Sequence, residues 1–255
     1  MAGCGWLWVQ YVCTLVRPIS VNARKAMKNN LTSQNGILLP FWDVLQIFRG
    51  YNMIKWLFFD LGSTLIDESA CDEFRLQELL NQKNAPGRGE VLSAIRHFAS
   101  LNLNAYRETA EMFGLNTTPW PVHLEKLYPD AKPVLSKLKK RYHLGIIANQ
   151  NPGTLDRLEG FGIGSIFDVV VSSGDFGKAK PDPKIFLWAL KAAHCKPAEA
   201  AMIGDRLDND IVPAQRLGRA TVWIKQGMGK YGDADLLPQK PDHTVSTLPE
   251  LLDIL

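Results

Sequence analysis

Short apolar runs alternate with amphipathic stretches from Met53 to the end of the chain. Five of the runs have the length of a buried strand: Ile54–Phe59, His143–Ala148, Asp168–Val171, Ala200–Ile203 and Ala220–Ile224. Strands that alternate with helices typically build a parallel sheet with helices on both faces. We therefore predict an α/β fold around a mostly parallel sheet, and we expect ligands at the carboxyl ends of its strands.

About eighty residues separate the first two predicted strands, far more than a simple crossover needs. Two parts of this segment, residues 67–82 and 91–113, are each predicted to form a helix. The second carries an apolar stripe at spacings of three and four, made of Val91, Ile95, Phe98 and Leu101. Breaks fall at Ala85–Gly87 and Thr118–Pro121. We predict a small helical cap over residues 66–126, inserted into a core made of residues 53–65 and 127–255.

Residues 1–52 show no sustained period and no candidate chemistry. We interpret them as an N-terminal extension outside the catalytic fold, with a targeting or docking role as the alternative. The apolar run Trp6–Val16 is too short to span a bilayer, lacks a positively charged start and contains Gln10 and Thr14. No membrane association is expected from it.

The formal charge of +3 is unevenly distributed. Residues 1–52 hold five basic residues against Asp43 alone, so the remainder of the chain is close to neutral. This distribution argues against a nucleic-acid partner. The four cysteines have neither zinc-site spacing nor the density of a disulfide scaffold, which indicates a reducing, cytoplasmic environment.

Polar clusters follow several predicted strands. Asp60 comes directly after the first strand and opens a glycine-containing loop, an arrangement suited to a nucleophile or a metal ligand. Asn149 follows the second strand, where backbone N–H groups before a helix can hold an anion. Lys180 precedes Asp182-Pro183, a good helix start, and Gly204-Asp205 ends a strand before the acids Asp208 and Asp210. Each segment alone is also explained by ordinary turn or helix-start preferences.

In this order and spacing, the four segments resemble the four motifs of the haloacid dehalogenase superfamily, and the resemblance covers about Met53 to Leu255. It implies a Rossmann-like three-layer core, a helical cap, Mg²⁺, and in most members phosphatase activity on a small phosphorylated substrate through an aspartyl-phosphate. Asp60 matches the nucleophile and Lys180 the charge-balancing lysine. The expected metal ligands are Asp60, the carbonyl of Gly62, Asp205 and Asp210, and the expected substrate-binding residues are Ser63, Thr64 and Asn149.

The charges of these residues support the same assignment. Three carboxylates, one lysine and a divalent cation make a neutral site, whereas the site without metal would repel a phosphate dianion. Oxygen ligands and water are the preferred shell of Mg²⁺.

Two positions depart from the family pattern. Gly62 stands where most family phosphatases have a second Asp, which protonates the leaving group, a role worth about 10²- to 10⁴-fold in rate. Ala148 stands where a hydroxyl usually binds the phosphate. We therefore expect a preference for acyl, aryl or other activated phosphates. Asp67 and Glu68 are the nearest carboxylates that could replace the missing acid, but the sequence favours reading them as first-turn acids of a cap helix.

Two alternative functions stay open. One is a haloacid-type dehalogenase, which needs no second Asp but has no use for Asp205 and Asp210. The other is a degenerate relative that binds a phosphorylated ligand or a protein without turnover. Substrate identity should depend on the cap, and the sequence does not indicate the oligomeric state. The cap's candidate substrate contacts are Arg75, Arg88, Arg96, His97 and Arg107.

Overall fold

The structure is a computed structural model, and it describes residues 54–255. The predicted extension over residues 1–52, including the run Trp6–Val16, lies outside the described residues. Among the described residues, no helix combines the length and the apolar character needed to cross a membrane.

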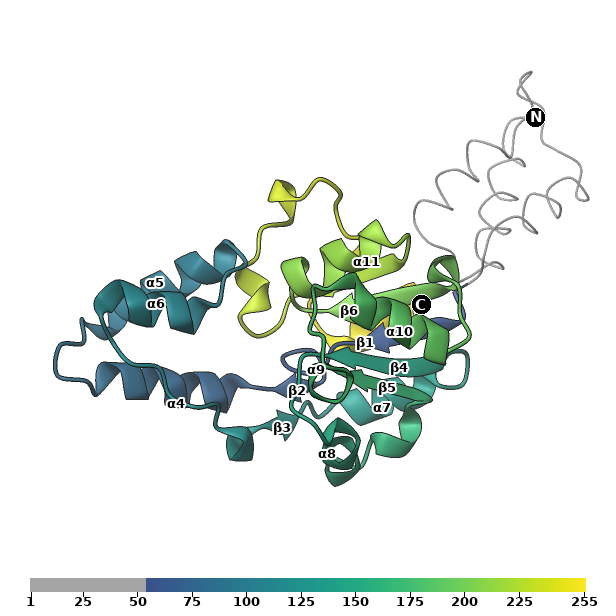
Figure 1. The fold of residues 1–255 in the computed structure, drawn as a ribbon, viewed down its shortest axis with the longest axis horizontal. Helices are drawn as coiled ribbons and strands as arrows, with labels where there is room; N and C mark the ends of the chain where they lie inside the picture. Colours follow the sequence, from purple (N-terminus) through teal and green to yellow (C-terminus); the bar gives the residue numbers. More distant parts are fainter. Residues whose placement is uncertain (1–53) are drawn as a thin grey trace, which may run out of the picture.

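A six-stranded parallel sheet forms the centre of the described part of the chain, in the order β5-β4-β1-β6-β7-β8 (Figure 1). Its strands are β1 (Trp56–Phe59), β4 (His143–Ala148), β5 (Val169–Ser172), β6 (Ala200–Gly204), β7 (Ala220–Ile224) and β8 (His243–Val245). The five expected strands are all present within one or two residues at their ends. The short strand β8 was not among the predicted strands.

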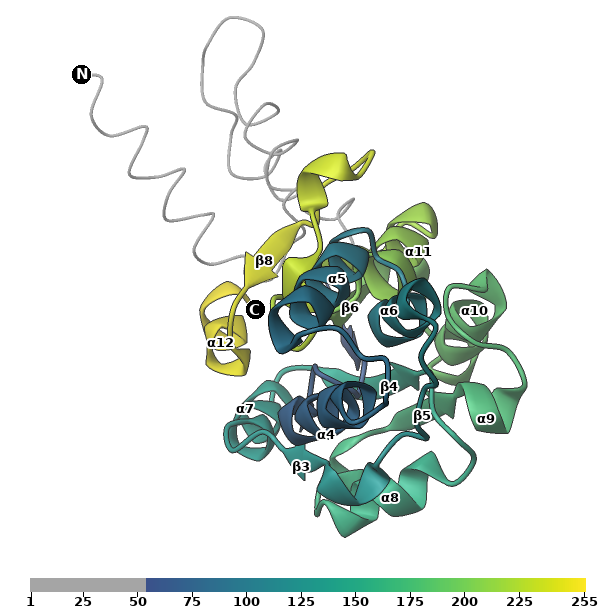
Figure 2. The same cartoon turned by 90° about the vertical axis from the view of Figure 1, so that its left-hand side faces the viewer.

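Side chains of β1 alternate between the two faces of the sheet, as the period of a strand requires. Leu57 and Phe59 belong to a hydrophobic cluster with α7 (Ala131–Leu138) on one face, whereas Trp56 and Phe58 pack with α10 (Pro183–Ala192) on the other. Figure 2 shows α7 and α12 on one side of the sheet and α10 on the opposite side. This arrangement confirms the predicted three-layer α/β core.

The remaining helices of the core are short. They are α8 (Thr154–Gly160), α9 (Ser173–Phe176), α11 (Val212–Arg216) and α12 (Leu251–Ile254). Single helical turns connect several elements: η2 (Gly164–Ile166), η3 (Pro197–Glu199), η4 (Leu207–Ile211), η5 (Gly229–Tyr231), η6 (Ala234–Leu236) and η7 (Leu248–Glu250).

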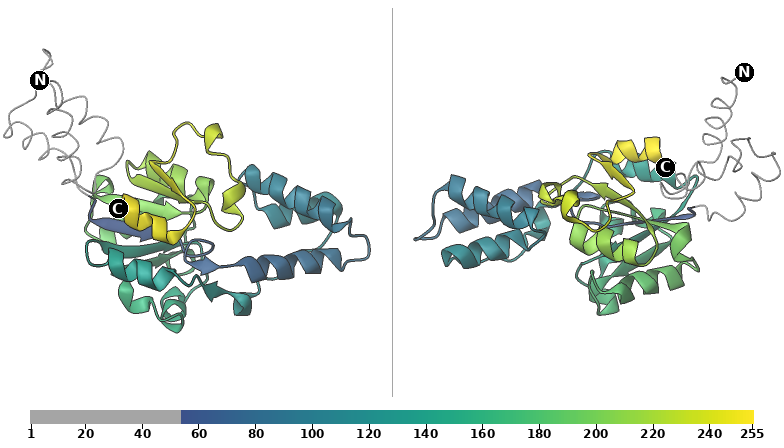
Figure 3. Two further views of the ribbon diagram at one scale, coloured as in Figure 1. Left: turned by 180° about the vertical axis from the view of Figure 1, so that it is seen from behind. Right: turned by 90° about the horizontal axis from the view of Figure 1, so that it is seen from above.

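The segment between β1 and β4 leaves and re-enters the core through a two-stranded antiparallel pair, β2 (Ile66–Asp67) and β3 (Lys126–Leu127). Between these strands lie α4 (Ser69–Leu80), α5 (Arg88–Ser100), α6 (Ala105–Phe113) and the turn η1 (Val122–Leu124). The three helices project from one end of the core (Figure 3). We use the name cap for α4, α5 and α6.

The expectation of one continuous helix over residues 91–113 is wrong. The chain forms α5 and α6, separated at residues 101–104, where Asn102 adopts a positive φ of 59° and Asn104 caps α6 by accepting a hydrogen bond from the Arg107 N–H. Asn is one of the residues that tolerates this conformation and favours an N-cap. Leu101, the last member of the predicted stripe, is exposed as a result.

Candidate active site

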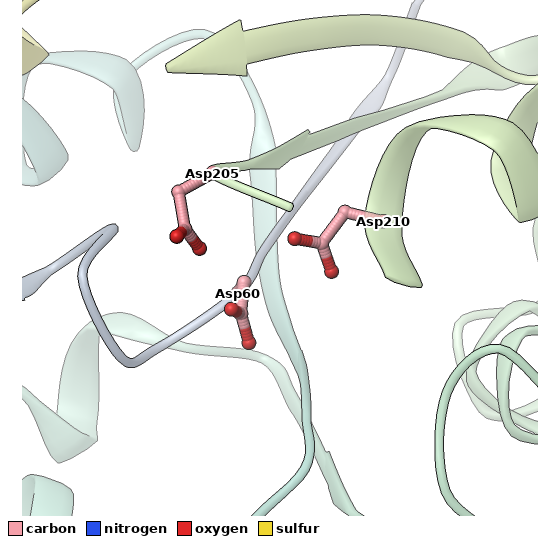
Figure 4. A group of neighbouring side chains, drawn as sticks. All are labelled: Asp60, Asp205 and Asp210. Carbon is pink, nitrogen blue, oxygen red and sulfur yellow. The ribbon is translucent and has the colours of Figure 1, made fainter. Parts of the chain in front are cut away.

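Three aspartates meet at the carboxyl ends of β1 and β6. Asp60 directly follows β1 and Asp205 directly follows β6, and the two strands are neighbours that pair Phe59 with Ile203. The Asp60 N–H extends this pairing by donating to the Ile203 carbonyl at 2.9 Å. Asp210 comes from the π-helical turn η4. One carboxylate oxygen from each aspartate lies within 4.8 Å of the others (Figure 4), and all three residues are buried. We call them the carboxylate trio.

Asp210 reaches the trio because residue 204 has no side chain. A Cβ on Gly204 would lie 2.3 Å from Asp210 Oδ2, a distance that no real contact allows. The Arg206 N–H donates to the same oxygen at 3.0 Å and fixes the carboxylate. The Gly-Asp pair at the end of β6 therefore supplies one ligand candidate and makes room for another.

Lys180 bridges two members of the trio. Its Nζ donates to Asp60 Oδ1 and to Asp210 Oδ1, both at 2.6 Å, and its side chain is only 2% exposed. Asn149 positions the lysine backbone, because its side-chain Oδ1 accepts from the Lys180 N–H at 2.7 Å and its Nδ2 donates to the Lys180 carbonyl at 2.9 Å. The Asn149 side chain thus holds the Lys180 backbone through one donor and one acceptor, and the Asn149 backbone N–H is a candidate for the predicted substrate contact.

The trio carries more negative charge than the protein neutralises. Burial, together with the neighbouring carboxylates, raises the pKa of Asp205 well above its ordinary value, and burial also raises the pKa of Asp210 despite Lys180. Burial opposes the charged form of Lys180, yet Asp210 and Asp60 outweigh it and raise the pKa of Lys180 to about 12. Three carboxylates against one ammonium favour a bound divalent cation. Carboxylate oxygens are the donors that hard cations such as Mg²⁺ prefer, so the donor set fits that ion.

A cavity of about 330 Å³ lies beside the trio, with Asp60 and Asp205 in its lining. Asp60, Lys180 and Asp205 line it from the core, while Arg75 and Tyr106 line it from the cap. A substrate held against Asp60 would therefore be enclosed partly by cap residues.

Comparison with known proteins agrees with this geometry. The family model of haloacid dehalogenase-like hydrolases matches residues 54–218. The chain belongs to this family.

Two relatives and one solved structure illustrate the similarity of the hydrolase to characterised proteins. A glyceraldehyde 3-phosphate phosphatase of Pyrococcus furiosus is 34% identical over 79% of the hydrolase and 93% of the relative. The pyrophosphatase PpaX of Bacillus velezensis is 30% identical over 78% of the hydrolase and 94% of the relative. The crystal structure of an HAD phosphatase from Thermococcus onnurineus is 26% identical, with a TM-score of 0.55 over 79% of the hydrolase and 97% of that chain.

The loop after Asp60 contains three further predicted site residues, Gly62, Ser63 and Thr64, and it does not bring all of them to the cavity. Gly62 and Ser63 line the cavity, and Ser63 has a positive φ of 53°. The Gly62 carbonyl accepts a hydrogen bond from the Thr64 N–H at 2.6 Å, which leaves one lone pair of that oxygen for a cation. Thr64 itself is fully buried and does not line the cavity, so the structure does not bring it to the expected substrate position.

Glu68 is the carboxylate of the hydrolase that lies beside this loop. Ser63 Oγ donates to Glu68 Oε2 at 2.7 Å, and Glu68 lines the same cavity as Asp60. Burial, followed by the nearby Asp60 charge, raises the pKa of Glu68 to about 8, although the Ser63 hydrogen bond opposes the rise. Asp67, in contrast, accepts from the Ser69 N–H at 2.9 Å and does not line that cavity. Of these two neighbouring acids, Glu68 lines the cavity beside Asp60 and Asp67 does not.

One arginine of the cap stands apart from the other candidate substrate contacts. The guanidinium of Arg75 lies 3.9 Å from the Tyr106 ring centroid and 5.3 Å from that of Trp120, and it lines the cavity without an ion pair to any described carboxylate. Arg88 pairs with Glu73, and Arg107 pairs with Glu108, both at the surface. The sequence pattern treated these arginines alike, because stacking between α4 and α6 has no local signature.

The two other cap candidates lie outside the cavity. The guanidinium of Arg96 lies 5.8 Å from the Tyr231 ring centroid, and the His97 ring contacts Phe98. Neither residue lines the cavity beside the trio.

Proposed function

We propose that the hydrolase is a Mg²⁺-dependent phosphatase that acts on a small phosphorylated metabolite through an aspartyl-phosphate on Asp60. The observation that carries this proposal is the buried contact of Lys180 with Asp60 and Asp210 at the floor of a cavity. A carboxylate fixed by a strand end and held by a lysine is positioned to attack an electrophile. The excess negative charge of the trio supports a metal-assisted reaction on an anionic substrate.

Each residue of the site has a role in this proposal. Asp60 supplies the attacking oxygen, and Lys180 compensates charge between Asp60 and the phosphoryl group. The trio and the Gly62 carbonyl would hold Mg²⁺, which when bound neutralises charge on the phosphate. The Asn149 backbone N–H is proposed to hold a phosphate oxygen. The hydroxyl of Ser63 lines the same cavity, but its proton is donated to Glu68.

Arg75 favours a substrate with a polar organic part. The cavity of about 330 Å³ shares Glu68, Arg75 and Asn149 with a second cavity of about 990 Å³, so the substrate class is inferred from Arg75 and not from volume. A stacked guanidinium without a carboxylate partner suits a hydroxyl, carbonyl or anionic oxygen of the substrate. Relatives named glyceraldehyde 3-phosphate phosphatases make triose phosphates the first class to test.

The proposal is tested by phosphate release from a panel of phosphorylated metabolites, with Mg²⁺ or with a chelator. We expect release that requires Mg²⁺ and that the substitution Asp60→Asn abolishes. Lys178→Met, at an exposed lysine two residues before Lys180, serves as the matched control and should retain activity. Hydrolysis that persists in the Asp60→Asn variant would contradict the proposal.

The same protein samples discriminate the two alternatives. Chloride release from a 2-haloacid without metal would indicate a dehalogenase. Thermal stabilisation by beryllofluoride and Mg²⁺, without any hydrolysis that depends on Asp60, would indicate a binding protein. We also propose a cytoplasmic location, which the spacing of the four cysteines favours.

A further inference from the structure

The loop after Asp60 lacks a carboxylate at position 62, but the fold brings one to the same place. A Cβ built on Gly62 would lie 2.5 Å from Glu68 Oε1 and 3.1 Å from Glu68 Oε2. The Glu68 carboxyl carbon would lie 3.0 Å from the same Cβ. The Glu68 carboxyl therefore lies directly against the place where a side chain at position 62 would begin.

Three features hold Glu68 in this position. It directly follows β2, whose pairing with β3 anchors the entrance to the cap, and it is the N-cap residue of α4. Ser63 Oγ donates to Oε2 at 2.7 Å, which leaves Oε1 as the atom nearest the vacant Cβ position. The carboxyl shares the cavity with Asp60 and Lys180.

We propose that Glu68 is the general acid and base of the phosphatase reaction, supplied from the entrance to the cap instead of from the loop. This inference rests on the proposed function. In this proposal the carboxyl contacts the leaving-group oxygen directly, from its place in the cavity beside Gly62. The expected preference for activated phosphates, which assumed that no acid was present, then belongs to a variant without Glu68.

The proposed steps balance as follows. An Asp60 oxygen forms a bond to phosphorus while the bond from phosphorus to the ester oxygen breaks. The leaving oxygen keeps the electron pair and takes the proton of Glu68. Water then attacks the phosphorus of the aspartyl-phosphate and gives a proton to the Glu68 carboxylate. The Asp60 carboxylate leaves, so one ester and one water yield an alcohol and inorganic phosphate.

The first test compares substrates with poor and good leaving groups in the Glu68→Gln variant of the full chain with Mg²⁺. For glycerol 3-phosphate, which has an alkoxide leaving group, we expect kcat to fall by about 10²- to 10⁴-fold. For 4-nitrophenyl phosphate, we expect a rapid burst of one nitrophenolate per active site, because transfer to Asp60 needs no proton. Slow turnover should follow, because the aspartyl-phosphate then lacks its base.

Asp67→Asn is the matched control, because it removes the neighbouring carboxylate that does not line the cavity. Its rates should stay within about threefold of the original protein. Glutamine can keep the hydrogen bond from Ser63, so the Glu68→Gln loop should remain folded. Alkyl phosphate turnover that survives Glu68→Gln, or a nitrophenolate burst that is lost as completely as alkyl turnover, would overturn the inference.

A second test exchanges the two positions. Glu68→Ala should lose alkyl phosphate turnover. Gly62→Asp alone should push the flexible end of the Glu68 side chain aside, because its Cβ would lie 2.5 Å from Glu68 Oε1. Gly62 is not among the positive-φ residues, so a side chain is tolerated once Glu68 is shortened. We expect the double variant Gly62→Asp/Glu68→Ala to recover at least about tenfold over Glu68→Ala. A double variant that gives the burst but no recovery would contradict the equivalence of the two carboxyl positions.

Failure of this inference is distinguishable from failure of the proposed function. If the original protein releases phosphate in a reaction that requires Asp60, and Glu68→Gln changes nothing, only the inference fails. If phosphate release does not require Asp60, the proposed function fails first.

Discussion

Replacing Lys180 with methionine removes the cation that contacts both Asp60 and Asp210 among the described residues. Each contact is 2.6 Å long, and the lysine side chain is 2% exposed. Removing one partner of a buried ion pair typically costs about 3–5 kcal/mol, because the remaining charge is left without compensation. We therefore expect the metal-free Lys180→Met variant to lose about 3–5 kcal/mol of unfolding free energy. For a domain of this size, that loss corresponds to a fall in Tm of roughly 6–20 °C.

Mg²⁺ should restore part of this stability, because it compensates the same carboxylates. The assay is thermal and urea-induced unfolding of Lys180→Met and of the control Lys178→Met, each with a chelator and with excess Mg²⁺. The rise in Tm caused by Mg²⁺ should be larger for Lys180→Met than for the control. The reasoning is refuted if the metal-free variant unfolds within about 0.5 kcal/mol of the original protein, the range of an ordinary surface substitution.

Three further predictions concern the metal, the cap and the glycine beside Asp210. Burial raises the pKa of Asp210 from 3.8 to about 7. Protonation of Asp210 therefore stabilises the metal-free fold fully below pH 3.8, and this stabilisation is lost as the pH rises through about 7. Mg²⁺ should raise Tm more at about pH 8 than at about pH 5, and an equal rise at both would contradict this. Arg75→Met should raise KM about 10- to 100-fold with little change in kcat, whereas Arg88→Met should change neither, as steady-state kinetics will show. Gly204→Ala should lower activity and cost about 1–3 kcal/mol in urea unfolding, because its Cβ would meet Asp210 at 2.3 Å, while Gly89→Ala, with open space around it, should not destabilise the fold.

The positions of the central residues could be predicted from the sequence because they depend on strand ends. Buried runs such as Trp56–Phe59 and Ala200–Gly204 identify parallel strands, and the carboxyl ends of neighbouring parallel strands meet at one edge. Asp60 and Asp205 therefore had to lie close together once the two strands paired. Lys180 was predicted as a site residue from its motif and not from a hydrophobic period. It lies in the loop before α10, from which its Nζ contacts Asp60 and Asp210.

Features that depend on side-chain contacts across elements could not be derived from the local sequence. The break between α5 and α6 has no glycine or proline and relies on Asn102 and Asn104, which a helical pattern tolerates. Glu68 stands at the start of α4, as expected of a helix-start acid, but nothing in its local sequence shows that its carboxyl lies beside Gly62. Thr64 was grouped with Ser63 by adjacency, but the positive φ of Ser63 directs the two residues differently.

Identification of the phosphorylated residue tests the central claim most directly. The protein is mixed with Mg²⁺ and a phosphate ester that it hydrolyses, and the reaction is quenched in acid within milliseconds. The sample is then reduced with borohydride and analysed by peptide mass spectrometry. An aspartyl-phosphate is converted to homoserine by this treatment. We predict homoserine at position 60, dependent on substrate and absent from Asp60→Asn. Turnover with no modification at Asp60, together with full activity of the Asp60→Asn variant, would contradict the account.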